Sequence, residues 1–293
     1  SESMSLCSSF RKNKKCRYFN NLLKFKKKKK QFEQAVMSIA SCPNDAQDLI
    51  EFSEQSDICP YFFSKFLMEH EKIVVCNYQW IFQPEIRQNF LETLGISLNQ
   101  CIIIMDECHN LPEMANRINS FRLYTFTLRQ ATKDLKITRA THKLLNFIKS
   151  LQKMIKSVKK QVVDEIELKA YPFIKQVLNK NKLGSVQELK ILLKDLKEYG
   201  DAIEFEKIDQ GKTPRNYIRP IHQFFENLLE HLDDPAYFPC VTAKETKRGK
   251  SVAFELKCLS PRLVTDPIFQ DSFATLSLSG TLDPYNYTSL LGL

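Results

Sequence analysis

The residues of this chain best suited to chemistry lie in the stretch 101–113, CIIIMDECHNLPE. Four apolar residues, 102–105, are followed at once by Asp106, Glu107 and His109. One carboxylate in such a place can hold Mg²⁺, and its neighbour can orient or deprotonate an attacking water. This combination predicts nucleotide hydrolysis. The alternative is a strand that runs into a polar turn without a catalytic role.

Short apolar runs predict the elements that position these carboxylates. The run 102–105 is rich in β-branched residues and predicts a strand buried on both faces, as in a parallel sheet. Open α/β sheets bind their ligands at the carboxyl ends of such strands. The runs 73–75 and 273–277 predict two further strands of the same sheet, and residues 85–94 predict a crossover helix closed by Gly95.

The tetrapeptide that follows the central strand resembles a known motif. Asp106-Glu107-Cys108-His109 is similar to the DExH box, motif II of superfamily-two helicases. Asn110 and Leu111 extend the match to the DEAHN(L/I) form of the XPD-like helicases, which include XPD, FANCJ and DinG. Cys108 stands where XPD usually has Ala, a change between small residues. The resemblance implies that Asp106 binds Mg-ATP and that Glu107 and His109 act in hydrolysis.

Three more segments carry the same resemblance and follow the family's order. Residues 59–62, CPYF, resemble the CPYF/CPYE element of the family. Residues 72–84 resemble its ADVVVxNYxYLxDP segment. Residues 279–282, SGTL, resemble motif III, which implies that Ser279, Gly280 and Thr281 contact motif II and link the ATP state to the grip on nucleic acid. We therefore expect Ser279 or Thr281 within hydrogen-bonding or one-water reach of the DExH box.

Four cysteines lie near the beginning of the chain, at Cys7, Cys16, Cys42 and Cys59. Their long and unequal spacings favour an Fe–S centre over a compact zinc knuckle, and ordinary buried thiols are the alternative. The family resemblance implies a [4Fe–4S] cluster held by Cys7, Cys16 and Cys59, with the first ligand upstream of Ser1. A competing register uses all four cysteines, so Cys42 is left open.

Basic residues are concentrated at the same end of the chain. The formal charge is +9, and residues 1–30 contain eleven Lys and Arg with one acid, so that residues 31–293 sum to about −1. Cations interleaved with aromatic rings can neutralise phosphates and stack on bases. The run Lys26–Lys30 could equally be a solvated or disordered face. The predicted DNA-binding residues are Arg11, Lys12, Lys14, Lys15, Arg17 and Tyr18.

From about residue 120 to 237 the pattern predicts helices. Apolar residues recur at helical spacing over 144–158, a capping box at Ser185 opens a second helix that ends near Gly200, and a third covers roughly 216–232. Position and helicity resemble the Arch domain that XPD-like helicases insert between motifs II and III. The resemblance implies protein partners through this domain. After it, residues 251–259 predict an edge or near-edge strand.

Several classes of protein are disfavoured by composition. No apolar run approaches the ~20 residues of a membrane span, and nothing resembles a signal peptide. Nine cysteines without a secretory signal favour a reducing compartment. The tripeptide Gly211-Lys212-Thr213 lacks the upstream glycine and strand of a P-loop and predicts a polar loop. We expect a cytoplasmic protein of archaeal type, or a nuclear one if the source is eukaryotic.

The predicted fold class is α/β: a partial RecA-like parallel-sheet motor with an Fe–S domain and an inserted, mainly helical Arch domain. The predicted boundaries are 1–62 for the Fe–S domain, 63–119 and 246–293 for the motor, and 120–245 for the Arch domain. The resemblance implies a piece of an ATP-dependent 5′→3′ DNA helicase that acts in repair on single-stranded DNA and duplex junctions, with ATP, Mg²⁺ and the cluster as cofactors.

Without a P-loop or a second motor domain, residues 1–293 alone are expected not to hydrolyse ATP. Two alternatives are a non-motor Fe–S nucleic-acid-binding module, and a nuclease or decayed helicase of the same superfamily.

Overall fold

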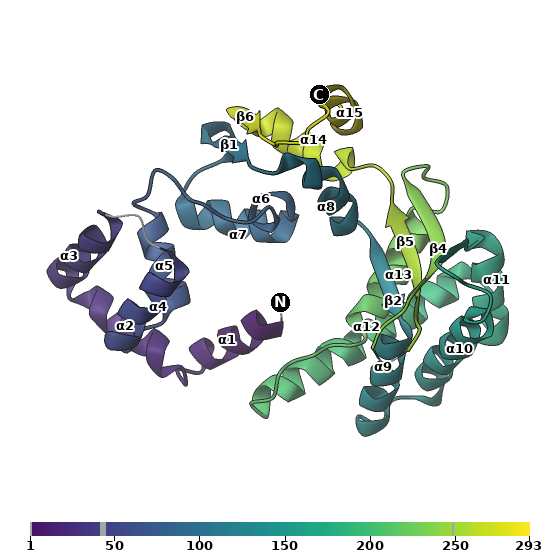
Figure 1. The fold of residues 1–293 in the computed structure, drawn as a ribbon. Helices are drawn as coiled ribbons and strands as arrows, with labels where there is room; N and C mark the ends of the chain where they lie inside the picture. The colour runs from purple at the N-terminus through teal and green to yellow at the C-terminus, as the bar shows by residue number, and fades with distance from the viewer. Residues whose placement is uncertain (1, 42–44, 248) are drawn as a thin grey trace. The chain divides into compact units, whose positions relative to one another are not determined.

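The computed structural model shown in Figure 1 describes residues 2–41, 45–247 and 249–293. The chain divides into two compact units. The split unit contains residues 4–112 and 264–293, and the central unit contains residues 113–263 with residues 1–3. Helices and strands occur in both units, so the predicted α/β class is confirmed at that level. Within the described residues, no helix is long and apolar enough to cross a membrane.

The split unit is built mainly of short helices, two 3₁₀ turns and a pair of strands. Its elements are α1 (Glu2–Lys12), α2 (Arg17–Lys27), α3 (Lys29–Ala40), α4 (Ala46–Gln55), α5 (Pro60–Met68), α6 (Gln79–Phe82), α7 (Pro84–Leu94), η1 (Leu98–Gln100), β1 (Ile102–Met105), η2 (Cys108–Asn110), α14 (Arg262–Asp271), β6 (Ala274–Ser277) and α15 (Pro284–Leu291).

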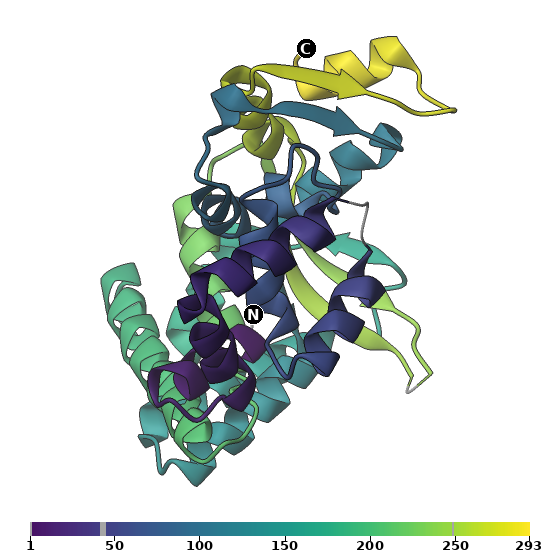
Figure 2. The same cartoon turned by 90° about the vertical axis from the view of Figure 1, so that its left-hand side faces the viewer.

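The two strands of the split unit pair in parallel and lie side by side in Figure 2. Their register runs from Ile102 opposite Ala274 to Met105 opposite Ser277. Two backbone hydrogen bonds extend this ladder beyond the strands: Leu278 N–H donates to Met105 O at 2.8 Å, and Cys108 N–H donates to Leu278 O at 3.0 Å. The predicted parallel pairing of these two runs is confirmed, and both strands end at the same edge.

The prediction that β1 is buried on both faces is wrong. Ile103 and Met105 are buried, whereas Ile102 and Ile104 are 65% and 63% exposed. Alternate side chains of a strand point to opposite faces, so one face of this sheet packs and the other does not. No element of the described residues covers the second face.

The predicted strand at 73–75 is also absent. This segment has no strand pairing, and Ile73 and Val75 are 82% and 94% exposed. β-Branched composition favours an extended backbone, but a strand exists only where a neighbour completes its ladder. In the described chain β1 pairs with β6 alone.

Local signals place the helices that flank these segments. Pro60 and Pro84 occupy the first turns of α5 and α7, where a missing N–H costs nothing. Gly95 ends α7 in the left-handed region at φ +66°, as predicted for the helix at 85–94. Helices α2 to α5 share a small core whose buried side chains are Leu22, Phe32, Val36, Ile58, Phe63 and Leu67.

The central unit combines longer helices with an antiparallel sheet. Its elements are α8 (Leu111–Ile118), β2 (Phe121–Tyr124), α9 (Thr125–Ile137), α10 (His142–Val158), β3 (Glu165–Glu167), α11 (Ala170–Lys180), α12 (Val186–Asp209), α13 (Arg219–Glu230), β4 (Tyr237–Lys244) and β5 (Ser251–Cys258). The amphipathic helix predicted over 144–158 and the helix predicted near 216–232 are confirmed as α10 and α13.

The sheet of the central unit has the strand order β2-β5-β4-β3. Strand β5 therefore lies between β2 and β4, next to the edge strand β2, so its predicted near-edge position is confirmed. Residues 251–258 pair with β4 over the full lengths of both strands, so this part of the segment 246–293 lies in the antiparallel sheet. Leu123, Val241 and Phe254 contribute one face of this sheet to the helical core.

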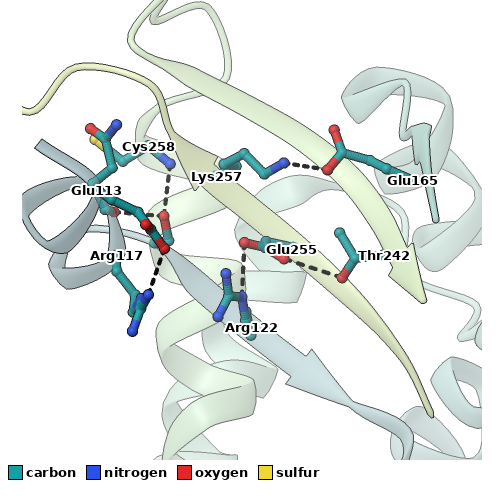
Figure 3. A network of polar contacts seen from close by, with 10 residues as sticks. Glu113, Arg117, Arg122, Glu165, Thr242, Glu255, Lys257 and Cys258 are labelled. Carbon is teal, nitrogen blue, oxygen red and sulfur yellow. Dashed lines mark hydrogen bonds and ion pairs between the residues drawn. The ribbon is translucent and has the colours of Figure 1, made fainter. Parts of the chain in front are cut away.

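The other face of this sheet carries a polar network, shown in Figure 3. Glu255 is only 2% exposed, with Arg122 Nε 2.8 Å from its Oε1 and the Thr242 hydroxyl donating to its Oε2 at 3.1 Å. Beside it, Lys257 forms an ion pair with Glu165. A buried carboxylate requires such partners, and these come from β2 and β4. The network therefore fixes the register of three neighbouring strands.

Helix α12 runs through Gly200, where the sequence predicted that it would end. A Cβ at Gly200 would lie 3.0 Å from both Asn216 Oδ1 and Ile218 Cβ. The glycine therefore permits the close approach of the chain before α13, and it does not act as a C-cap. The helix ends at Asp209, and Gly211 follows at φ +67° in the polar loop that was predicted there.

Replacement of Phe225 by Ala tests the central core. Phe225 is fully buried and its ring packs against those of Phe147, Phe173 and Phe224. We expect a loss of about 3–5 kcal/mol in the free energy of unfolding, measured by urea denaturation. Phe205→Ala on α12 is the matched control, because Phe205 is 73% exposed and its loss should change stability little. Equal losses would contradict this assignment of the core.

Candidate functional site

The acidic pair of the candidate site follows directly from β1. Asp106 and Glu107 form the turn between β1 and η2, and both are exposed. Asp106 Oδ1 accepts a hydrogen bond from the Glu107 N–H at 3.0 Å. Glu107 has φ +51°, a left-handed conformation that is uncommon outside glycine. The turn thus presents two carboxylates to solvent, where a metal ion and a nucleophilic water can reach them.

A histidine joins this turn to the end of β6. His109 Nδ1 lies 2.7 Å from Ser279 Oγ and 3.2 Å from Glu107 Oε2. The predicted contact between motif III and the box is therefore confirmed for Ser279. Thr281 instead donates its backbone N–H to Ser279 Oγ at 3.4 Å, and Gly280 lies between them. His109 thus contacts both Glu107 and the segment that follows β6.

Two tyrosines that the sequence analysis did not select hold the ends of the strands. The Tyr78 hydroxyl donates to the Asp106 carbonyl, and burial raises the pKa of that phenol. Tyr287 Oη lies 3.1 Å from Ser277 Oγ, and burial raises the pKa of Tyr287 to about 12. Both phenols therefore stay protonated at neutral pH. The Asn77-Tyr78 dipeptide of the family-like segment was the signal that could have identified Tyr78.

Three of the four candidate cluster ligands lie in the same neighbourhood of the split unit. Cys7 is on α1, and Cys16 and Cys59 occupy the N-cap positions of α2 and α5 without making a capping hydrogen bond. Burial raises the pKa of Cys59, and charge on Cys16 and Cys7 raises it further, whereas the N–H groups of Phe62 and Tyr61 lower it. Thiols that influence one another and amides that stabilise a thiolate suit ligands of a metal cluster.

The described thiols of this region do not form a complete metal site. Among the residues that the structure describes, no three His, Cys, Asp or Glu side chains form a group ready to hold a metal ion. Cys42 lies outside the described residues. Both ligand registers, with and without Cys42, therefore remain open.

The predicted DNA-binding residues divide into two classes. Arg11 stacks over the rings of Phe62 and Phe19, with its guanidinium carbon 4.3 and 5.2 Å from their centroids. Arg17 forms an ion pair with Asp57 at 2.6 Å. The hydrogen bond to Asp57 and the charge of its carboxylate raise the pKa of Arg17. Both arginines thus make contacts within the protein that stabilise the fold.

The remaining predicted DNA-binding side chains are exposed, and the ring of Tyr18 also contacts Arg17, whose guanidinium carbon lies 5.1 Å from its centroid. Lys12, Lys14, Lys15 and Tyr18 are exposed. The lysine run Lys26–Lys30 is exposed too, and it lies in α2, α3 and the single residue between them. Lys26 Nζ lies 3.8 Å from the centroid of Phe66. The described run is therefore helical and exposed.

Ser279→Ala tests the bridge between the two strand ends. Loss of the hydroxyl removes one of the two partners of His109 Nδ1, so the ¹⁵N chemical shift of this nitrogen should move in a two-bond ¹H–¹⁵N spectrum. The ring of His70 is the internal control, because its Nδ1 contacts only the nearby Phe66 carbonyl at 3.0 Å. An unchanged His109 signal beside an unchanged His70 signal would show that the bridge is absent.

Comparisons with known proteins found one family model and several relatives that are similar to parts of this chain. Residues 1–128 match the family model described as DEAD_2. An ATP-dependent DNA helicase CHL1 of Candida albicans is 28% identical over 204 residues, which cover 69% of this chain and 22% of that protein. A Fanconi anemia group J protein homolog of Gallus gallus is 32% identical over 91 residues, covering 31% and 7%. A regulator of telomere elongation helicase 1 homolog of Anopheles gambiae is 27% identical over 129 residues, covering 44% and 12%.

The chain spans about a fifth or less of the length of these three relatives. A solved structure titled XPD_APO aligns with 74% of this chain and 37% of that chain at a TM-score of 0.47 and 19% identity, a likeness too weak to establish the fold. The three relatives are eukaryotic, and the expected archaeal type finds no support among them. The sequence matches thus show that parts of this chain are similar to these three relatives, two of which are named as helicases.

Proposed function

We propose that this chain forms part of the ATP-hydrolysing motor of an XPD-like DNA helicase that moves 5′→3′ along single-stranded DNA. The observation that carries the proposal is the position of His109, which contacts both Glu107 after β1 and Ser279 after β6. A motor requires its hydrolytic residues to be linked to a second element that can respond to the nucleotide. This bridge provides such a link.

Each residue of the turn has a distinct task in the proposed reaction. The Asp106 carboxylate would hold Mg²⁺, which, when bound, neutralises charge on the phosphates of ATP. Glu107 would orient the attacking water and accept its proton. Tyr78 holds the Asp106 carbonyl and so limits the freedom of the turn. The exposed carboxylates and the anchored backbone together suit a site that exchanges its nucleotide.

His109 and Ser279 would transmit the nucleotide state. If Glu107 shifts when the terminal phosphate is present, its contact with His109 changes at the same time. Ser279 contacts His109 and also accepts a hydrogen bond from the Thr281 N–H. A change at His109 would therefore alter the position of the backbone after β6. Gly280 between them gives this segment the freedom to respond. The proposed coupling thus depends on chain segments that are 170 residues apart.

The domain assignments are part of the same proposal. Residues 1–62 would form the Fe–S domain, with Cys7, Cys16 and Cys59 as cluster ligands and Lys12, Lys14, Lys15 and Tyr18 facing single-stranded DNA. Residues from 120 would form the inserted Arch domain, which we extend to Cys258 because β5 pairs with β4. Work on duplex junctions in DNA repair, protein partners of the Arch domain and a nuclear location accord with the names and eukaryotic sources of the relatives.

Glu107→Gln in the complete protein tests the hydrolytic assignment. The amide keeps the shape of the side chain but cannot accept a proton, so DNA-stimulated ATP hydrolysis should fall about 10²–10⁴-fold. Binding of a fluorescent ATP analogue should be retained, because the carboxylate of Asp106 is unchanged.

Glu113→Gln is the matched control for this substitution. Glu113 is an exposed residue of α8 that pairs with Arg117 at 2.6 Å, and its loss should leave turnover near normal. Full turnover in Glu107→Gln would refute the motor assignment and favour a nucleic-acid-binding module without hydrolysis.

Cysteine substitution tests the cluster. Anaerobically purified protein should contain iron and absorb broadly in the visible range, and Cys16→Ser or Cys59→Ser should lower the iron content to near zero. Cys42→Ser decides between the registers, because full iron content supports an upstream ligand and lost iron supports the use of all four cysteines.

Cys76→Ser provides the control for the cluster experiment. Cys76 is exposed and lies outside the group formed by Cys7, Cys16 and Cys59, so its substitution should leave the iron content unchanged. Stoichiometric zinc without iron in the parent protein would rule out both cluster registers.

A further inference from the structure

A second concentration of positive charge lies in the central unit. Residues 125–160 contain ten Lys and Arg and a single acidic residue, Asp134. The charge sum over residues 31–293 conceals this segment because acidic residues elsewhere in the chain offset it. The ten cations belong to α9, α10 and the turns that follow them.

On α9 the cations form one row. Arg129, Lys133 and Lys136 follow one another at i, i+4 and i+7, and all three are exposed. This spacing brings side chains onto one side of a helix. The buried residues of α9, which are Leu128, Ala131 and Leu135, lie on a different side and face the core.

Helix α10 repeats the same arrangement. Lys149, Lys153 and Lys156 are exposed and again follow the spacing i, i+4 and i+7. They lie opposite the apolar side of this amphipathic helix. That apolar side contributes Leu144, Phe147, Ile148, Leu151, Met154 and Ile155 to the core.

The contact between α9 and α10 shows that both rows face the same way. The two helices are joined by a short turn and pack side by side (Figure 1). Gln152 Nε2 donates to Leu128 O at 2.9 Å and to Thr132 Oγ1 at 2.8 Å, which defines the side that each helix turns toward the other. Successive residues of an α-helix are turned by about 100° around its axis. In two antiparallel helices that meet at Gln152 and Thr132, this spacing places the apolar residues of both helices on one side of the contact and the cations on the other.

In the described residues, no carboxylate forms an ion pair with a cation of this face. Asp134 turns away from it and pairs with Lys207 at 2.9 Å. Within the described parts of the chain, none of the six cations forms an ion pair. We call the surface made by Arg129, Lys133, Lys136, Lys149, Lys153 and Lys156 the basic hairpin face.

We infer that the basic hairpin face binds the sugar–phosphate backbone of duplex DNA. Steps of three and four residues space the cations of each row by about 4.5–6 Å along the helix axis, and packed helices lie about 8–10 Å apart. Two rows of cations on one face can contact phosphates of both strands of a duplex at the same time. All six residues are Lys or Arg, whose charged groups neutralise phosphates, so the face suits contact with the sugar–phosphate backbone.

The inference extends the proposed function, on which it rests for the choice of DNA as ligand. The exposed residues near the N-terminus would take the single strand, and the basic hairpin face would take duplex that is still paired. The binding itself needs neither ATP nor the cluster. Its test is therefore separate from the tests of the motor.

The experiment measures binding of residues 1–293 to a fluorescein-labelled 20-base-pair duplex by anisotropy, without ATP and over a series of salt concentrations. The variant carries Lys149→Gln, Lys153→Gln and Lys156→Gln. Each lost phosphate contact lowers the slope of log K against log salt by about 0.9. We expect the slope to fall by about 2–3 and the affinity at 100 mM salt to fall about tenfold or more.

The chain offers a matched control in the same unit. Lys190, Lys194 and Lys197 are exposed on α12 and share the spacing i, i+4 and i+7, but acidic residues such as Asp195 and Glu198 stand among them. Their replacement by Gln removes the same formal charge and should lower the affinity less than twofold. Equal losses in the two variants would show a diffuse field and would overturn the inference.

Lysine acetylation provides a second readout in the unmutated chain. Mass spectrometry after brief treatment with an acetylating reagent should show Lys149, Lys153 and Lys156 protected by the duplex and Lys190, Lys194 and Lys197 unprotected. Equal protection of the first three lysines by a single strand of the same sequence would overturn the assignment to duplex. Equal competition by poly-L-glutamate would instead assign the face to an acidic polypeptide.

Discussion

The parallel pairing of β1 with β6 is the constraint on which the candidate site depends. The two strands lie far apart in the sequence, and the ladder between them continues past their ends through Leu278 and Cys108. Closing so long a segment costs conformational entropy that grows only slowly with length, so an inserted unit of this size is compatible with a short two-stranded sheet. Once the strands are in register, the box and the SGTL segment are brought to the same edge, and the bridge through His109 requires only side-chain positions.

The central unit has a hydrophobic core of its own. It has a continuous apolar core between its helices and one face of its four-stranded sheet. The opposite face of the sheet is held by Glu255, whose partners come from β2 and β4. A buried carboxylate is costly without such partners, and removal of one partner leaves an unpaired charge. The same network therefore specifies strand register, while the apolar face supplies most of the stabilisation.

Charge is distributed over the molecule in a way that follows its structure. Near the N-terminus, Arg11 and Arg17 are used within the fold and the lysines around them are left to solvent. On the hairpin of α9 and α10 the cations are all displayed on the outer side, because the inner side of each helix is apolar. Exposed like charges repel one another, and a polyanion relieves this repulsion. Each of the two units thus has a basic surface of its own.

Features whose causes lie within a few residues could be predicted from the amino-acid sequence. Gly95 and Pro84 set the bounds of α7, apolar spacing identified α10, and the order of the short motifs placed the box beside its partner segment. Features that depend on elements distant in the sequence became visible only in the folded structure. The segment 73–75 lacks a strand partner, Ile102 and Ile104 lack a covering layer, and β5 lies inside a sheet because β2 and β4 flank it. Gly200 shows the same limit within one residue, because glycine is common at helix ends but here lies inside α12, where it permits the close approach of Asn216 and Ile218. Local propensity reports what a segment can adopt, whereas burial and strand pairing depend on atoms that are distant in the sequence.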